Sequence, residues 1–577
     1  MATTGEPQTT LDTPTHLPVQ WQSNSFLNVN AGTIGRTVST KSEANTSSRF
    51  SFWIGKAQQA PTAPDIGLEI GNIIAAQSDD KLDVTFGTIV EMRSYTDVES
   101  FIADYLSHNF GDATIQVPTD VSEVVVVTCN VMRNLSLRTK PIGRSQVFFP
   151  SPLGIRYAYG IVDSTGAPLF AGAEIPIGMF ENGDGTVASV AVDEHFVIGP
   201  EGAHVNVSGI SGLASKTSAA QFLIKSLLTH TKKNVAVIMF NVKSRDLLYI
   251  DQPNGRALAD PWSVAAYSTL GVPLEPFNNA RFFAPADPND PKGTQSLRTL
   301  PTERFQWDLS LIRDDIPTLF DAEDWDDKTE GVWYRISEQI DTGGIVSYAN
   351  MLAWIDKTIN QASKNNTTTI FGQHIATWNK VTARLRMFPK RYRGLITPAG
   401  MGVDIPWKGL KANSIYVIDI QMLADRAKKL VFGRAIRELS DLMETEGKAL
   451  DAIVVFVDEL NKFAPGGNVR TPLKSRLVDI TARGRSMGLV LVGAEQFASS
   501  VEKEIIENCT THLFGRTEAN ELRAANYGSL TDEVKTKLMM LPQGSLLAKF
   551  AKFPQPIFVR FPYPPCLPGD QFKMSKA

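Results

Sequence analysis

The chain has 577 residues, of which 43% are hydrophobic and 20% charged, the composition of a globular protein with room for about two to four domains. Its formal net charge is −4. That balance excludes a protein that binds nucleic acid through a uniformly basic surface, so any contact with DNA needs a local basic patch or a ring of several subunits.

The cysteines and the hydropathy of the chain indicate in which cellular compartment the protein is expected. The three cysteines, Cys129, Cys509 and Cys566, lie far apart and have neither metal-ligand spacing nor the density of a disulfide framework. No apolar run approaches the length of a membrane span, and the first residues lack the basic-then-apolar pattern of a signal peptide. We therefore expect a cytoplasmic protein with no membrane contact.

The first third of the chain divides into a tail and an all-β module. Residues 1–48 are rich in Thr, Ser, Gln, Asn and Pro without periodicity, which predicts a disordered tail. Residues 49–202 contain β-branched runs separated by Gly, Asp and Pro, a pattern that predicts a small β-barrel. These runs occupy residues 82–92, 124–131, 155–162 and 187–192.

Alternating strands and helices follow, so the predicted fold class is α/β with an N-terminal barrel. Residues 203–265 are expected to form the first part of the core, 266–406 an inserted helical bundle, and 407–577 the second part. The end of the insertion, residues 380–393, carries six basic residues. They are either a DNA-facing patch or the solvated face of a bundle helix.

Residues 208–217, Ser-Gly-Ile-Ser-Gly-Leu-Ala-Ser-Lys-Thr, join an apolar strand to a helix expected at 218–230. In a phosphate-binding loop, backbone N–H groups and a helix N-terminus hold the phosphate oxygens. Lys216 then contacts the β- and γ-phosphates, and the Thr217 hydroxyl is a ligand of Mg²⁺. Ile210 and Ser215 stand where such loops usually have glycine.

The alternative for this segment is an ordinary strand-to-helix turn, because Gly209 and Gly212 lie out of register with the usual pattern. Under the nucleotide interpretation the predicted binding residues are Gly209, Ser211, Gly212, Ser215, Lys216 and Thr217.

The run Ile-Val-Val-Phe-Val at 453–457 is followed by Asp458 and Glu459. A buried parallel strand that ends in two carboxylates presents acid at the carboxyl edge of its sheet. Asp458 is expected to hold Mg²⁺ through water and Glu459 to polarise the attacking water. The alternative is a buried strand that runs into a polar loop, but the two segments in this order favour a nucleoside triphosphate site.

A second apolar run, residues 489–494, ends next to Gln496, whose amide suits a γ-phosphate sensor. Arg483 and Arg485 precede this run and suit a guanidinium supplied to the nucleotide site of a neighbouring subunit. The alternatives are a helix-capping role for Gln496 and interfacial ion pairs for the two arginines.

These motifs resemble those of HerA-type ATPases, a family in the FtsK–HerA branch of RecA-like P-loop motors. The resemblance covers about residue 50 to the C-terminus. It is carried by the loop at 209–217, the Asp-Glu strand with the Leu-Asn-Lys-Phe-Ala-Pro that follows it, and the Gly-Arg-Ser-Met-Gly-Leu-Val-Leu-Val-Gly-Ala-Glu-Gln stretch. It implies a RecA-like core with ATP and Mg²⁺ bound between subunits.

The resemblance also implies a homo-oligomer, typically a hexameric ring around double-stranded DNA, with an effector protein at the barrel face. That effector is a nuclease or a sirtuin-like NAD-consuming enzyme, and bacterial relatives suggest anti-phage defence. By carry-over Glu459 is the catalytic base, Gln496 the sensor, and Arg485 the first and Arg483 the second candidate for the trans arginine. Residues 553–565 are expected to cross to the adjacent subunit.

Two functional classes stay open. One is a helicase-like motor in which ATP hydrolysis drives translocation on duplex DNA. The other is an ATP-dependent ring that assembles or restrains its effector with little translocation.

Overall fold

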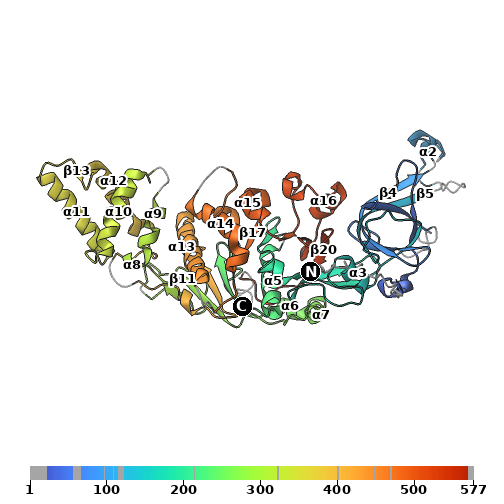
Figure 1. Cartoon of the computed structure of the whole chain (residues 1–577), viewed down its shortest axis with the longest axis horizontal. Helices are drawn as coiled ribbons and strands as arrows, with labels where there is room; N and C mark the ends of the chain where they lie inside the picture. Colours follow the sequence, from blue (N-terminus) through green and yellow to red (C-terminus); the bar gives the residue numbers. More distant parts are fainter. Residues whose placement is uncertain are drawn as a thin grey trace, which may run out of the picture. The chain divides into compact units, whose positions relative to one another are not determined.

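The computed structural model describes residues 23–55, 66–96, 98–107, 109–112, 114, 123–213, 215–290, 292–320, 324–398, 402–445, 449–467 and 471–569. The chain divides into two compact units, one of residues 1–67 and 73–158 and the other of residues 68–72 and 159–577 (Figure 1). Residues 1–22 of the predicted tail lie outside the described residues.

In the first unit, strands β1 to β6 close into an antiparallel barrel in the order β1-β2-β5-β4-β3-β6. Along β2, Phe50, Phe52 and Ile54 are buried whereas Arg49 and Trp53 are exposed. This alternation is what a barrel wall around a packed interior requires. The elements of this unit are β1 Gly35–Val38, β2 Arg49–Ile54, β3 Ile73–Ser78, β4 Val84–Thr96, α2 Phe101–Ser107, β5 Glu123–Asn134, β6 Ser145–Phe148 and α3 Pro152–Ala158.

The predicted barrel is present, but its limits differ from the predicted ones. Strand β1 lies inside the segment predicted to be disordered, because four residues are too few to give a readable pattern. The run at 155–162 is not a strand: helix α3 begins at Pro152, a residue well suited to the first turn of a helix. The run at 187–192 is a strand, β8, but it belongs to the other unit.

The described residues of the second unit form a 12-stranded sheet in the order β12-β11-β15-β10-β16-β17-β9-β18-β19-β20-β7-β8. From β12 to β18 all neighbours are parallel. Strands β10, β16 and β17 are buried along their whole length, which explains their continuous apolar sequences. These strands are β9 Val205–Ser208, β10 Val235–Asn241, β11 Ala280–Pro285, β12 Glu303–Phe305, β15 Ile415–Asp419, β16 Ala452–Asp458, β17 Leu489–Glu495 and β18 Thr511–Phe514.

The other end of the sheet is antiparallel, from β18 through β19, β20 and β7 to β8. Its strands are β7 Glu174–Glu181, β8 Val187–Asp193, β19 Ser545–Phe550 and β20 Ile557–Arg560. Strand β20 lies within residues 553–565, the segment expected to cross to a neighbouring subunit, and it pairs with β19 and β7 of its own chain. Beyond it, the carbonyl of Tyr563 accepts a hydrogen bond from the Tyr267 hydroxyl at 2.8 Å.

Helices connect and flank the parallel strands (Figure 1). They are α4 Glu194–Val197, α5 Lys216–His230, α6 Gly255–Ala259, α7 Pro261–Leu270, α13 Asp425–Glu444, α14 Pro472–Met487, α15 Lys503–Glu507 and α16 Asp532–Met539. None of the helices within the described ranges combines the length and apolar character needed to cross a membrane.

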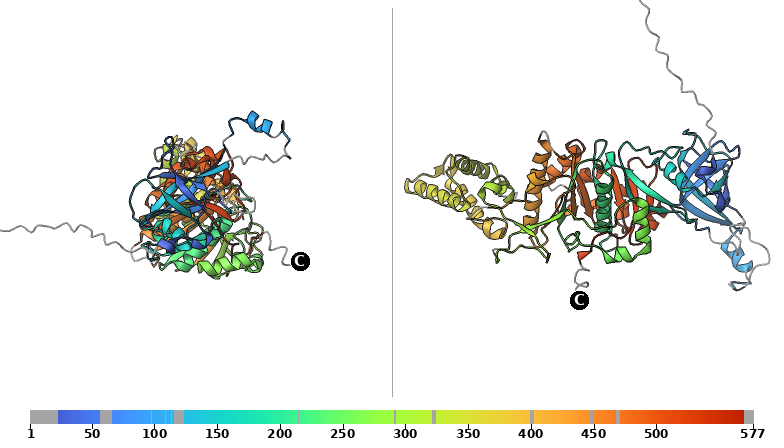
Figure 2. Two further views of the ribbon diagram at one scale, coloured as in Figure 1. Left: turned by 90° about the vertical axis from the view of Figure 1, so that its right-hand side faces the viewer. Right: turned by 90° about the horizontal axis from the view of Figure 1, so that it is seen from below.

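The inserted helices form a group of their own, seen in yellow in Figure 2. They are α8 Leu309–Ile312, α9 Ile316–Leu319, α10 Asp327–Asp341, α11 Tyr348–Lys364 and α12 Ile375–Arg391, with the short pair β13 Thr369–Ile370 and β14 Gln373–His374. The insertion is therefore shorter than the predicted 266–406. Its first part instead supplies β11 and β12, whose mixed polar sequences suit the edge of the sheet.

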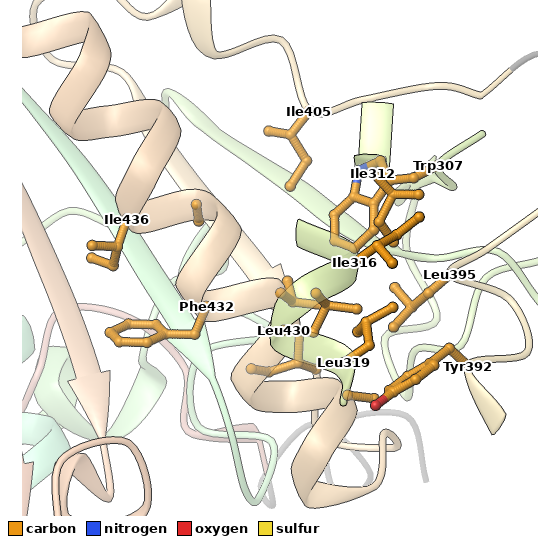
Figure 3. Packing of buried hydrophobic residues seen from close by; sticks show 14 of the residues in the cluster. Trp307, Ile312, Ile316, Leu319, Tyr392, Leu395, Ile405, Leu430, Phe432 and Ile436 are labelled. Carbon is orange, nitrogen blue, oxygen red and sulfur yellow. The ribbon is translucent and has the colours of Figure 1, made fainter. Parts of the chain in front are cut away.

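Helix α13 joins the insertion to the sheet. Trp307, Ile312 and Leu319, from the start of the insertion, belong to the same buried cluster as Leu430 and Ile436 of α13 (Figure 3). The cluster also contains the apolar residues of β10, β15 and β16. Insertion and parallel sheet thus share one continuous core, which fixes α13 between them.

Candidate nucleotide site

The predicted phosphate loop leaves the carboxyl end of β9, in the middle of the sheet. Strands β17 and β18 flank β9, and both hold the start of the loop. The Gly209 N–H donates to the Glu495 carbonyl at 3.2 Å, and the Ile210 N–H to the Arg516 carbonyl at 2.8 Å. Because both acceptors lie at strand ends, the loop starts from a rigid edge.

The loop ends in a residue with left-handed backbone. Ser215 has φ 49° and ψ 36°, and its side chain does not cap α5. A residue with a Cβ adopts this conformation at a steric cost that glycine avoids. Gly209, at φ 144°, and Gly212, at φ 80°, are loop positions where glycine supplies such freedom. Ser215 therefore has the backbone expected of a glycine, although the sequence has serine there.

Lys216 is the first residue of α5, and its side chain turns back into the loop. The residue is 7% exposed, and its Nζ donates to the Gly209 carbonyl at 2.7 Å. Burial lowers the pKa of Lys216, an effect that the nearby Asp458 carboxylate opposes. The first N–H groups of α5 have no intrahelical acceptor. The lysine and these N–H groups together form a cradle for an anion.

The acidic pair ends β16, which lies two strands from β9, with β17 between them. Asp458 is 5% exposed, and burial raises its pKa while Lys243 and Lys216 oppose that effect. Glu459 has left-handed backbone at φ 59°, and its N–H donates to Asp458 Oδ1 at 2.9 Å. The sharp turn at Glu459 sends the two neighbouring carboxylates in different directions.

Two lysines hold the Glu459 carboxylate. Lys243 Nζ lies 2.8 Å from Oε1, and Lys462 Nζ lies 2.5 Å from Oε2. Burial alone would raise the pKa of Glu459, but the hydrogen bonds from Lys243 and Lys462 lower it. The carboxylate therefore stays ionised and is engaged by cations on both of its oxygens.

Lys216, Lys243 and Asp458 line one pocket of about 270 Å³, whereas Glu459 is not part of its lining. Its lining consists of Ser211, Gly212, Ser215, Lys216, Thr217, Ser218, Gln221, Lys243, Ser244, Asp246, Asp458 and Pro568. The described residues contain no cluster of three or more His, Cys, Asp or Glu side chains able to hold a metal ion by themselves. The pocket fits a different arrangement, in which Mg²⁺ takes few protein ligands and completes its shell with phosphate oxygens and water.

The remaining predicted residues lie outside this pocket. Gln496 follows the last residue of β17 and is exposed at the same sheet edge as the loop. Arg483 and Arg485 are exposed near the C-terminus of α14, which leads into the start of β17. A strand of seven residues spans about 23 Å. Both arginines therefore lie at the amino ends of the parallel strands, whereas the phosphate loop of the same chain lies at their carboxyl ends.

The two arginines differ in their surroundings. Arg483 Nε donates to Asp479 Oδ1 at 2.8 Å, an ion pair within one helix. The Arg485 guanidinium has no ion-pair or hydrogen-bond partner within the part of the chain that the structure describes.

Three of the six basic residues in the segment 380–393 form ion pairs within the insertion. Lys380 and Arg384 both pair with Asp324, and Arg386 pairs with Asp356. These pairs favour the solvated helix face over the DNA-facing patch.

Sequence reasoning included Lys243 only within residues 241–246, a polar strand end able to reach the nucleotide, and Lys462 only within the motif after the acidic pair; it gave neither lysine a role. Both follow apolar strands within polar loops, and nothing in their local sequence distinguishes them from other surface lysines. The only available signal is indirect: two parallel strands that pair bring the residues after them to the same edge.

In this α/β fold, a strand–loop–helix unit and the acidic end of another strand line the same pocket. Among solved structures, VirB4 of Thermoanaerobacter pseudethanolicus is similar at 14% identity and a TM-score of 0.41, over 68% of this chain and 96% of that one. The bacterial conjugative coupling protein TrwBdeltaN70 is similar at 13% identity and a TM-score of 0.40, over 64% of this chain and 86% of that one.

The genome packaging NTPase B204 from Sulfolobus turreted icosahedral virus 2, solved with ATP-gammaS, is similar at 18% identity and a TM-score of 0.21, over 26% of this chain and 68% of that one. No protein-family model matches the chain, and no curated protein does either. All three TM-scores are below 0.5.

Proposed function

We propose that this chain is a Mg²⁺-dependent ATPase that acts as a DNA-translocating motor in a ring of identical subunits. One observation carries the ATPase: Lys216 and Thr217 at the start of α5 share a pocket with Asp458 at the end of β16. Cation, hydroxyl and carboxylate are the groups that a nucleoside triphosphate with its metal requires. An ordinary strand-to-helix turn needs neither the buried lysine nor the facing carboxylate.

Each residue then has a role that its surroundings support. Lys216 exchanges the Gly209 carbonyl for phosphate oxygens, which also bond to the free N–H groups of α5. The Thr217 hydroxyl and, through water, Asp458 hold Mg²⁺, which when bound neutralises the charge that develops on the phosphate oxygens. Glu459 orients and deprotonates the attacking water once its lysine partners have moved away.

Hydrolysis at a subunit interface accounts for Arg485. Its free guanidinium is far from its own loop but available to the pocket of a neighbouring copy, where it would stabilise the transferred phosphoryl group. Gln496, exposed beside the loop, is the proposed sensor of the γ-phosphate. A ring of identical subunits, which is hexameric in HerA-type ATPases, would bring Arg485 of one copy to the pocket and Gln496 of the next.

The sequence resemblance alone supports the finer parts of the proposal. These are double-stranded DNA in the ring, an effector at the barrel face that is a nuclease or a sirtuin-like enzyme, and a role in anti-phage defence. The net charge of −4 agrees with DNA contact only through a local or ring-built surface.

The ATPase rate of the wild type and of Glu459→Gln, each with and without long duplex DNA, tests this function. The motor predicts hydrolysis that DNA stimulates strongly and that the substitution abolishes while nucleotide binding persists. No hydrolysis by the wild type under any of these conditions would refute the ATPase.

A scaffold is the second candidate, and the two lysines on Glu459 favour it because they keep the base engaged. It predicts that ATP fixes the assembly while DNA leaves the hydrolysis rate unchanged. That result would refute the motor and retain the nucleotide site.

A further inference from the structure

Lys243 occupies a position that only the sheet topology defines. It is the second residue after β10, which pairs in parallel with β16 so that Phe240 lies opposite Val457. Parallel strands in register end at the same edge, so Lys243 and Asp458 meet there. The Lys243 side chain is 35% exposed and lines the pocket that Lys216 and Thr217 also line.

The charge balance of the pocket gives Lys243 more than one possible partner. Its Nζ lies 2.8 Å from Glu459 Oε1 and 4.0 Å from Asp458 Oδ2. Burial alone would lower the pKa of Lys243, but the two carboxylates raise it. The lysine is therefore a firmly charged cation in the space where a phosphate chain would lie.

The same pocket contains a second ammonium group, that of Lys216. Lys216 and Lys243 repel each other, and Lys243 contributes to lowering the pKa of Lys216. The lining of this pocket of about 270 Å³ also contains Asp246 and Asp458, so it offers two ammonium groups to a polyanionic ligand and carboxylates to the Mg²⁺ that accompanies such a ligand. The triphosphate end of a nucleotide is such a ligand, and its terminal phosphate carries the most charge.

Lys462 shows that holding Glu459 does not by itself require a place in this pocket. It contacts Glu459 Oε2 at 2.5 Å but lines a different pocket, together with Lys428, Lys429 and Phe463. Glu459 thus has two lysine partners, and only Lys243 faces the phosphate loop.

We propose that Lys243 is a second phosphate-binding residue, which contacts the terminal phosphate of a bound nucleoside triphosphate and releases Glu459 as it does so. This role rests on the proposed nucleotide site and adds to it a residue that distinguishes a triphosphate from a diphosphate. In the absence of a terminal phosphate Lys243 returns to Glu459, and the base is again engaged.

Isothermal titration calorimetry of ADP and of a non-hydrolysable ATP analogue, both with Mg²⁺, tests this role in the full chain. Removing a charge-assisted hydrogen bond to the terminal phosphate should reduce the preference for the triphosphate by about tenfold or more. Lys243→Met should therefore lose most of this preference and keep its affinity for ADP. Lys243→Gln is the second variant and carries the same expectation if the methionine variant does not fold.

Lys462→Met is the matched control, because it removes the other lysine from Glu459 and should keep the wild-type preference. An unchanged preference in the Lys243 variants, or an equal loss in Lys462→Met, would overturn the role of Lys243 and leave the nucleotide site intact. A wild type that binds neither nucleotide would overturn both the proposed function and this role.

Discussion

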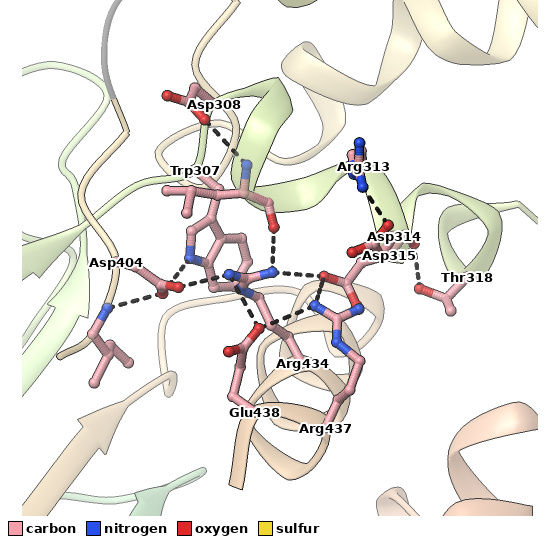
Figure 4. A network of polar contacts seen from close by, with 12 residues as sticks. Trp307, Asp308, Arg313, Asp314, Asp315, Thr318, Asp404, Arg434, Arg437 and Glu438 are labelled. Atoms are coloured by element: carbon pink, nitrogen blue, oxygen red, sulfur yellow. Dashed lines mark hydrogen bonds and ion pairs between the residues drawn. The ribbon is translucent and has the colours of Figure 1, made fainter. Parts of the chain in front are cut away.

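Replacing Arg434 with methionine tests how the helical insertion is fixed to the core. Arg434 lies on α13, and its side chain is 4% exposed. Its guanidinium lies 3.0 Å from Asp315 Oδ2 and 2.6 Å from Asp404 Oδ2, and it also donates to the Leu311 carbonyl (Figure 4). The acceptors lie at the two ends of the insertion, so one side chain on α13 holds both.

Methionine fills similar space but removes the Arg434 guanidinium from all of these acceptors. Asp315 is 5% exposed, and burial raises its pKa, which means that the protein environment stabilises its charge poorly. It keeps Arg437, at 2.6 Å, whereas Asp404 loses the guanidinium at 2.6 Å. Removing one partner of a buried ion pair costs about 3–5 kcal/mol. Opening of the insertion should become easier by a factor of about 100 to 1,000 or more.

Native-state hydrogen exchange is the suitable assay, because a chain of several parts does not unfold in one step. The loss of protection should be confined to peptides from α8 to α12 and from α13. Arg386→Met is the control: its pair with Asp356 is exposed on both sides and is worth less than about 1 kcal/mol. A change of less than tenfold in Arg434→Met, or one equal to that of the control, would refute the reasoning.

Two further predictions concern the nucleotide site. Ser215→Gly should stabilise the nucleotide-free chain by about 0.5–1 kcal/mol, since glycine adopts φ 49° without steric cost and the serine side chain caps nothing. The thermal midpoint measures this gain, and Ser215→Ala, which keeps the Cβ, should show none; a lower midpoint in Ser215→Gly would contradict the strain. Arg485→Ala should leave nucleotide binding intact and reduce ATP turnover by on the order of a thousandfold, while Arg483→Ala, which loses only a pair with Asp479, should reduce it far less. Equal losses of turnover in the two variants would contradict the assignment of Arg485 as the trans arginine.

The centre of the parallel core could be predicted from sequence because its fully buried strands are recognisable without knowledge of their neighbours. Strands β16 and β17 are continuous apolar runs, and each of their ends lies within one residue of the predicted limit. The assignment of β8 to the barrel failed for the opposite reason. Its pairing with β7 in the large sheet depends on contacts that no local pattern encodes.

The pocket divides in the same way. Lys216 and Asp458 belong to local motifs, a strand–loop–helix and an acidic strand end, so sequence alone brought them into one hypothesis. Lys243 belongs to no motif, and its place beside Glu459 follows from the pairing of β10 with β16. The left-handed backbone at Ser215 was equally hidden, because serine gives no sign of it.

Helix α13 gives the insertion a physical route to the pocket. In its first turn, the Lys428 Nζ donates to the Val242 carbonyl at 2.9 Å, one residue before Lys243. Arg434 follows six residues later, about 9 Å along the helix, and holds the insertion. The helix is buried around most of its circumference, because it packs against both the insertion and the sheet. Through these two contacts α13 links the ends of the insertion to Val242, the residue next to the lysine that engages Glu459.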